Sequence, residues 1–179
     1  MNVAIGIDYS MLCPAACVVS NTSALFWYAH TTKCPMIPCV TAIKVPETHS
    51  IIERADFLAR ELYKWVKLYN TASVGLEDYA FAATGRVFHI GENTGVMKHL
   101  LWTKGLDVTV YPPTVIKKFA TGKGNADKNK MTAAFVEAYP AAREWVAEFF
   151  PRTKDNIPAK SPLSDLADAY WIAKYQHSR

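Results

Sequence analysis

The chain has 179 residues, half of them hydrophobic and a fifth charged, which is enough to bury the core of one globular domain over residues 1–179. It contains no apolar run of the ~20 residues that a membrane span needs. No basic leader precedes its first apolar run, so we expect a cytoplasmic protein with no membrane partner. The net charge of +4 is too small to identify a partner, but residues 86–130 hold eight Lys or Arg against three Asp or Glu. This local excess indicates a surface that binds a polyanion.

The first element, residues 2–10, reads N-V-A-I-G-I-D-Y-S and predicts a buried central strand that closes on Asp8. A carboxylate at the end of such a strand is costly to desolvate unless it is paired or binds a cation. We therefore treat Asp8 as a candidate metal ligand. The alternative is a turn aspartate that bonds its own backbone.

Two β-rich runs follow, residues 15–20 and 24–30, and the N-T-S turn between them predicts an antiparallel meander. Residues 33–46 contain three prolines and are expected to form a loop or a weak edge strand. Residues 49–68 have apolar side chains at helical spacing, with Thr48 as a candidate N-cap, and predict a helix laid on the sheet.

The next strand, residues 72–76, ends on Glu77 and so repeats the pattern of the first. From here strands alternate with helices, which implies parallel pairing and a ligand site at the carboxyl ends of the strands. We expect a loop over residues 78–91. The elements expected after it are a helix at 92–104, a strand at 108–111, a short basic helix at 114–120, a helix from residue 126, and one or two short helices within 137–150.

The last predicted helix covers residues 162–176, with Ser161 as N-cap and a proline at the first helical position. It has little polar surface, so it is expected to be largely buried. Asp165 and Asp168 lie three residues apart and therefore point the same way. Two like charges on a buried helix are unfavourable unless something positive lies between them, and a divalent metal is the simplest candidate.

Four carboxylates therefore lie at strand ends or on a buried helix: Asp8, Glu77, Asp165 and Asp168. Together they predict an oxygen-rich site for Mg²⁺, with Mn²⁺ as a substitute. Two such ions can activate a water and stabilise the leaving oxygen of a phosphoryl transfer. With the basic segment beside it, the predicted substrate is a nucleic-acid phosphodiester. T-G-K-G at residues 121–124 does not fit a phosphate-binding P-loop, so no nucleotide cofactor is expected.

Four blocks of the sequence resemble the RuvC-type Holliday junction resolvases of the RNase H-like superfamily. They are G-I-D-Y-S at 6–10, G-L-E-D-Y at 75–79, Y-P-P-T-V-I-K-K at 111–118 with G-K-G-N-A-D-K at 122–128, and S-D-L-A-D-A-Y-W-I-A at 164–173. The divergence from bacterial members looks like that of a phage-encoded version, which would act in the cytoplasm of a bacterial host.

The resemblance implies an α/β, RNase H-like fold with a five-stranded mixed sheet flanked by helices. It also implies a homodimer that presents two active sites to branched DNA, a four-way junction. The four acids fall on the family's metal-binding tetrad, and Lys117 and Lys128 fall on basic residues that serve DNA binding and cleavage, with Lys128 counted as catalytic. The other basic residues expected on the DNA are Lys118, Lys123 and Lys130.

The family places an aromatic residue just after the second carboxylate, where it stacks on a base at the junction. The position in closest register here is Ala80, and Tyr79 and Phe81 flank it and can substitute. Arg86, Phe88 and His89 are further candidates for DNA contact, although packing of the loop onto the core explains these residues at least as well. Two alternative functions stay open from the sequence: an RNase H-like nuclease on RNA/DNA hybrids or flaps, and a junction-binding protein without catalysis.

Overall fold

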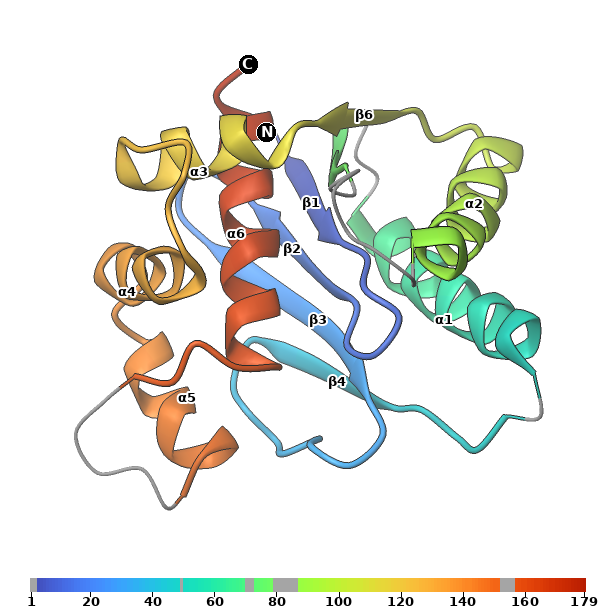
Figure 1. The fold of residues 1–179 in the computed structure, drawn as a ribbon, viewed down its shortest axis with the longest axis horizontal. Helices are drawn as coiled ribbons and strands as arrows, with labels where there is room; N and C mark the ends of the chain where they lie inside the picture. The colour runs from blue at the N-terminus through green and yellow to red at the C-terminus, as the bar shows by residue number, and fades with distance from the viewer. Residues whose placement is uncertain (1–2, 49, 70–72, 79–86, 152–156) are drawn as a thin grey trace.

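The computed structural model describes residues 3–48, 50–69, 73–78, 87–151 and 157–179 (Figure 1). In the described part of the chain, six strands form one sheet in the order β4-β3-β2-β1-β5-β6. The strands are β1 (Ala4–Asp8), β2 (Ala15–Val19), β3 (Ala24–His30), β4 (Val40–Lys44), β5 (Ser73–Glu77) and β6 (Val108–Tyr111).

The strand directions confirm the predicted mixed sheet. β1, β2 and β3 pair antiparallel as a meander, whereas β5 pairs parallel with both β1 and β6. The sixth strand is β4, which lies at the edge and pairs parallel with β3. The prolines at 35, 38 and 46 lie outside β4 and leave its five residues free to extend, so the weak edge strand expected at 33–46 forms here.

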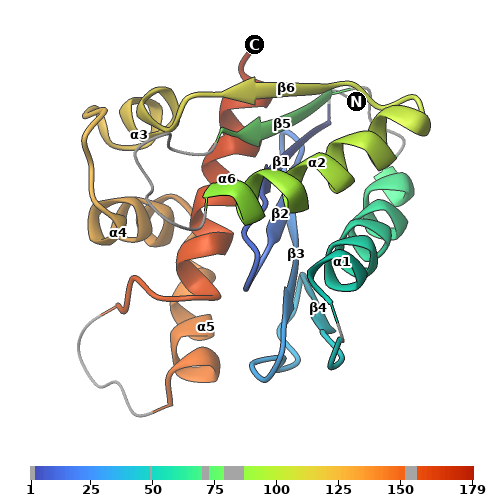
Figure 2. The same ribbon diagram turned by 45° about the vertical axis from the view of Figure 1, so that its right-hand side comes forward.

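Helices cover both faces of the sheet (Figures 1 and 2). One core cluster joins the sheet to α1 (Ile51–Val66) and α2 (Val87–Thr103). The other face packs against α6 (Leu163–His177), with α3 (Pro113–Thr121), α4 (Lys128–Ala138) and α5 (Ala142–Phe149) around it. Among the described residues, no helix combines the length and the apolar character needed to cross a membrane.

Three helices differ from the predictions in their cap residue or by several residues at their start. Ser50, not Thr48, is the N-cap of α1, because the Ser50 side chain accepts a hydrogen bond from the Glu53 N–H at 3.1 Å. The second helix begins at Val87 rather than 92, so Gly91, which interrupts the apolar spacing, lies inside it. The last helix begins at Leu163 with Pro162 in the cap position, so Ser161 is not its N-cap.

Helix α6 packs directly on the backbone of β1, and Gly6 makes this possible. A Cβ at residue 6 would overlap the Ala173 nitrogen and the Ala169 carbonyl oxygen of α6. Every residue of α6 from Leu163 to Ala173 except Asp168 is buried, as the sequence predicted. The glycine in G-I-D therefore fixes how close the last helix comes to the central strand.

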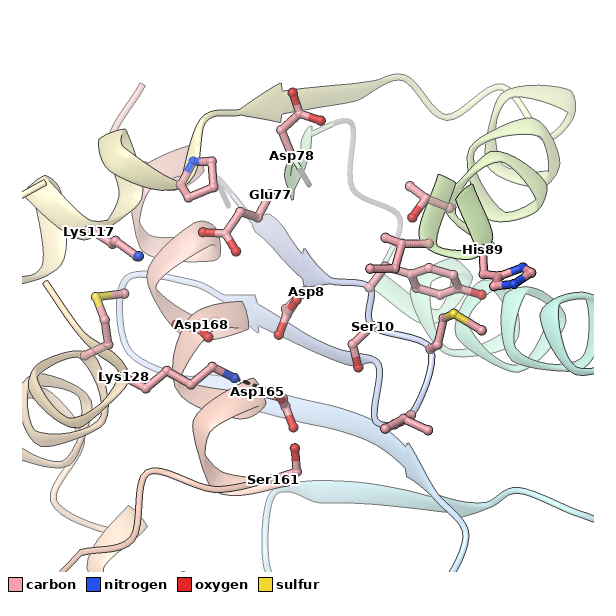
Figure 3. A pocket seen from close by; sticks show the side chains of 17 residues that line it. Asp8, Ser10, Glu77, Asp78, His89, Lys117, Lys128, Ser161, Asp165 and Asp168 are labelled. Carbon is pink, nitrogen blue, oxygen red and sulfur yellow. Dashed lines mark ion pairs between the residues drawn. The ribbon is translucent and has the colours of Figure 1, made fainter. Parts of the chain in front are cut away.

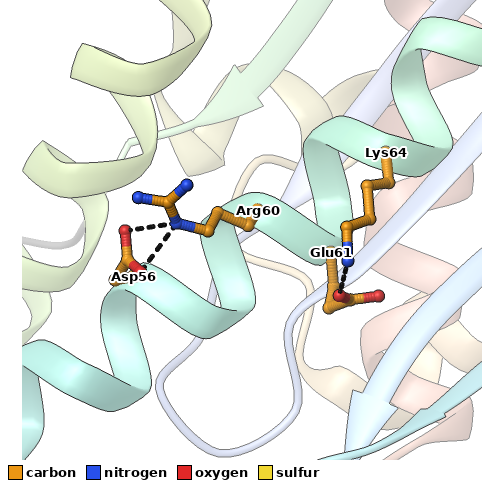
Figure 4. A network of polar contacts seen from close by, with 4 residues as sticks. All are labelled: Asp56, Arg60, Glu61 and Lys64. Atoms are coloured by element: carbon orange, nitrogen blue, oxygen red, sulfur yellow. Dashed lines mark hydrogen bonds and ion pairs between the residues drawn. The ribbon is translucent and has the colours of Figure 1, made fainter.

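The outer face of α1 is solvated instead. Two ion pairs lie along it, Arg60 with Asp56 at 2.7 Å and Lys64 with Glu61 at 2.5 Å (Figure 4). Exposed pairs of this kind at helical spacing contribute little to stability because water and salt screen them.

Candidate active site

A cavity of about 640 Å³ opens at the carboxyl ends of β1 and β5. All four predicted acids line it, Asp8 from β1, Glu77 from β5, and Asp165 and Asp168 from α6. Figure 3 shows the four side chains around this space, with the Asp165 carboxylate pointing toward Ser161. The structure therefore brings together four side chains that span 160 positions of the sequence.

Strand register and helix packing explain this convergence. β1 and β5 are parallel neighbours with Ile7 opposite Leu76, so the next residues, Asp8 and Glu77, are the last residues of the two strands at the same edge of the sheet. On α6, the contact with Gly6 holds the helix against β1. Its first two turns then carry Asp165 and Asp168 to the end of the same strand.

Burial makes these acids hard to ionise without a cation. It raises the pKa of Glu77 to about 7, against the opposing effect of Lys117 and Lys128. Burial and then the negative charge of Glu77 raise the pKa of Asp168 to about 7. The pKa of Asp8 is raised well above its usual value by burial and then by the neighbouring acids, and burial also raises the pKa of Asp165. Several buried like charges in one cavity are the electrostatic setting that a divalent cation relieves.

The donor set fits a hard divalent cation. All four candidate ligands are carboxylates, the ligand type that Mg²⁺ prefers. Asp165 is almost fully buried, yet its Oδ2 has no hydrogen-bond partner among the described residues. Within the same described ranges, no three His, Cys, Asp or Glu side chains already stand in the arrangement of an ion site. The carboxylates therefore have the right chemistry, and their side chains would have to turn to close around an ion.

Two of the predicted lysines reach the acids. Lys117 from α3 and Lys128 from the first turn of α4 both line the cavity. Lys128 Nζ lies 3.9 Å from Asp165 Oδ1, and its side chain is 64% exposed whereas that of Asp165 is 5% exposed (Figure 3). A cation that is half in water beside buried carboxylates can contact both the acids and an incoming phosphate.

Comparison with known proteins identifies the family. The family model described as "Crossover junction endodeoxyribonuclease RuvC" matches residues 28–139, more than half of the chain. This chain belongs to the RuvC family. The resemblance predicted from the four sequence blocks is confirmed.

Curated RuvC proteins of bacteria are similar to part of the chain. The Synechococcus sp. WH7803 protein is 28% identical over 107 residues, which are 60% of this chain and 66% of that protein. The Corynebacterium diphtheriae protein is 27% identical over 95 residues, which are 52% of this chain and 58% of that protein. The matched stretch is thus just under two thirds of the first relative and less of the second. The expected phage origin stays a prediction.

Solved structures extend the fold likeness to nearly the whole chain. Thermus thermophilus RuvC in complex with a Holliday junction substrate has a TM-score of 0.60 at 16% identity, over 97% of this chain and 90% of that one. The yeast mitochondrial Holliday junction resolvase Ydc2 also has a TM-score of 0.60, at 14% identity, over 97% of this chain and 77% of that one. These likenesses confirm the predicted RNase H-like α/β fold, with six strands in place of the expected five.

The remaining DNA-binding candidates of this RuvC-family chain divide into two groups. Lys118, Lys123 and Lys130 are exposed on α3, the following loop and α4, and they do not line the cavity. Tyr79, Phe81 and Arg86 lie outside the described residues, so their predicted contacts with DNA stay predictions.

Part of the cavity wall was not predicted from the sequence. Residues 9–12, which follow Asp8, line it together with His89, Ile90 and Thr94 of α2. His89 had been a candidate on equal terms with packing, and the structure places it at the cavity. Phe88, its neighbour, is 83% exposed and does not line the cavity. The one sequence feature that could have predicted this wall is that residues 9–12 directly follow Asp8, a candidate metal ligand.

Proposed function

We propose that this chain is a Mg²⁺-dependent endodeoxyribonuclease that resolves Holliday junctions by paired symmetric nicks. One observation carries the proposal. A chain of the RuvC family gathers Asp8, Glu77, Asp165 and Asp168 in one cavity and sets Lys117 and Lys128 beside them. The proposed nuclease occupies a single domain over residues 1–179.

The four carboxylates are the proposed ligands of two Mg²⁺ ions, with Mn²⁺ able to substitute. When bound, the ions would lower the pKa of a water and stabilise negative charge on the phosphate. The acids would hold these positive charges at one end of the sheet. Lys117 and Lys128 would contact the non-bridging phosphate oxygens, where negative charge develops during the reaction.

The reaction is a hydrolysis. A water oxygen forms a bond to phosphorus in line with the scissile P–O bond, which breaks and leaves its electron pair on the departing sugar oxygen. The attacking water loses one proton and the departing oxygen gains one.

The exposed lysines extend the proposed DNA path away from the cavity. Lys118, Lys123 and Lys130 are positioned to contact backbone phosphates of a duplex arm, which carries no sequence information but contributes affinity. Removing one such contact is expected to reduce the slope of log K against log salt by about 1. Fluorescence anisotropy of a labelled junction at several salt concentrations measures this slope.

A homodimer is the proposed assembly, because symmetric nicks need two active sites. Helix α2 offers a suitable face: Phe88 is 83% exposed, Trp102 is 68% exposed, and a Cβ on Gly95 between them would meet nothing within 4 Å. Val96 and Leu100 of the same helix instead pack against the core that α2 shares with α1. We therefore expect Trp102→Glu to yield monomers in analytical ultracentrifugation.

Cleavage of labelled DNA with Mg²⁺ tests the function. We expect paired symmetric nicks in four-way junctions and little cutting of linear duplexes. Equal cutting of three-way junctions, flaps or RNA/DNA hybrids would instead indicate a general RNase H-like nuclease. Tight junction binding without any cleavage would indicate a binding protein.

A further inference from the structure

The loop that follows Asp8 forms a second, largely apolar side of the cavity. Residues 9–12, called here the β1–β2 loop, line it with Tyr9, Ser10, Met11 and Leu12. Ser10 lies on the side away from Lys117 and Lys128 (Figure 3). Leu12 is 70% exposed although it is apolar. The cavity therefore has a charged side suited to a phosphate and an apolar side suited to a different part of the same nucleotide.

Arg54 of α1 forms hydrogen bonds to the backbone of this loop. Its Nε donates a hydrogen bond to the Met11 carbonyl at 3.0 Å, and its Nη2 donates to the Leu12 carbonyl at 3.4 Å. Directly after the loop, the Cys13 N–H donates back to Ser10 Oγ at 3.0 Å. A guanidinium presents its donors in a rigid planar fork, so one side chain fixes two consecutive peptide groups.

A second arginine on the same helix provides a contrast. Arg60 donates to the Asp56 carboxylate on the outer face of α1, and it does not line the cavity (Figure 4). Arg54 instead connects α1 to a loop that begins one residue after a candidate metal ligand. Arg54 thus forms hydrogen bonds to two residues, Met11 and Leu12, that line the cavity.

We propose that Arg54 is a positioning residue for DNA cleavage, and that it holds Leu12 and Met11 against a nucleobase that flanks the scissile phosphate. The inference rests on the proposed function. A phosphate placed at the four carboxylates leaves its sugar and base to extend across the cavity, toward the wall away from the lysines. Leu12 and Met11 lose exposed apolar surface when a base covers them, which stabilises this placement. Through the loop, Arg54 determines where the phosphate lies relative to Asp8.

Single-turnover cleavage of a four-way junction in Mg²⁺ compares Arg54→Ala, Leu12→Ala and the matched control Arg60→Ala. We expect the first two to slow cleavage roughly tenfold and the control to match wild type. Arg54→Lys should recover only part of the rate, because one ammonium does not reproduce the planar fork. The Mn²⁺-induced increase in Tm should be the same in all variants, because the acids are unchanged.

A double variant separates positioning from a general structural role. If Arg54 acts through Leu12, Arg54→Ala combined with Leu12→Ala should be no slower than the slower single variant. Multiplied losses, or a loss in Arg54→Ala that Leu12→Ala does not share, would overturn the inference.

Fluorescence from a labelled base in the DNA tests the base contact in the absence of cleavage. A 2-aminopurine base is placed on each side of the scissile phosphate in turn, and its fluorescence is recorded on binding in metal-free buffer. The signal for one of the two positions should change on binding to wild type and Arg60→Ala, and change less with Leu12→Ala and Arg54→Ala. Equal signals in all four proteins would refute the base contact. Normal signals without cleavage in Mg²⁺ would refute only the proposed resolvase activity.

Discussion

Helices α1 and α6 lie on opposite faces of the same sheet and place their charges in opposite ways. On α1, acidic and basic residues pair with each other in water, as Asp56 does with Arg60. On α6, Asp165 and Asp168 have no basic residue one turn away in the sequence, and they line a cavity. Charges paired along their own helix are compatible with a purely structural role. Charges without such a partner on a buried helix indicate a ligand or a reaction.

The largest expected difference in cleavage rate is between variants that lose an acidic charge on α6 and on α1. We expect Asp165→Asn to slow Mg²⁺-dependent cleavage by on the order of 10³-fold or more, because it removes a proposed ligand. Junction binding in metal-free buffer should persist. The matched control on α1 is Asp56→Asn, which should leave cleavage unchanged. Gel assays of nicking and of binding measure both. Loss of binding or of folding in Asp165→Asn would assign this residue to the structure instead.

The contact between α6 and β1 should be the more sensitive packing site. Gly6→Ala places a methyl group into the backbone of α6, so we expect a loss of about 3 kcal/mol or more in the free energy of unfolding. The control is Gly91→Ala on α2, where a Cβ meets nothing within 4 Å. That change should be neutral or stabilising by roughly 0.5–1 kcal/mol. Urea titrations followed by circular dichroism decide between them. Similar values for both variants would show that α6 can shift away from β1.

The buried acids should make stability depend on pH in the metal-free protein. Because the pKa values of Glu77 and Asp168 are raised to about 7, the folded state binds more protons than the unfolded chain between about pH 4 and 7. Stability should therefore fall as pH rises through this window, by several kcal/mol, because one pKa unit corresponds to about 1.4 kcal/mol. Mg²⁺ should raise Tm more at pH 8 than at pH 5, because it replaces the protons. Asp168→Asn should flatten the profile, and an unchanged profile would argue against this charge cluster.

Replacing a lysine on α4 and one on α1 should give variants with similar stability but different cleavage rates. Lys128→Ala removes an exposed cation beside Asp165, so we expect cleavage to slow roughly 10- to 100-fold. Its Tm should change little. Lys64→Ala, the control from the exposed pairs of α1, should affect neither cleavage nor Tm. A large drop in Tm for Lys128→Ala would count against a role at the phosphate.

Much of the scaffold was predictable because its signals are local. The apolar run before Asp8, the similar run before Glu77 and the apolar sequence around Asp165 and Asp168 determine burial by their composition alone. Parallel pairing then brings the strand ends together. β4 was less certain, because its short β-rich run is surrounded by prolines that argue against a central strand.

The rest depends on contacts that a single sequence does not display. Met11 and Leu12 have no periodicity that would assign them to a wall, and the hydrogen bonds from Arg54 link positions more than 40 residues apart. Two possible N-cap residues for α1 also lie close together in the sequence. Both Thr48 and Ser50 are good N-cap types, and only Ser50 has a glutamate three residues later.

The order of the elements along the chain has a consequence for synthesis. Two of the four proposed ligands lie on α6, and α6 follows every other described element. A polypeptide still emerging from the ribosome has the six strands and the lysines but only two of the four acids, and Gly6 of β1 has not yet met α6. Such a chain lacks two of the four proposed ligands, so we expect no metal-dependent cleavage until translation has passed Asp168.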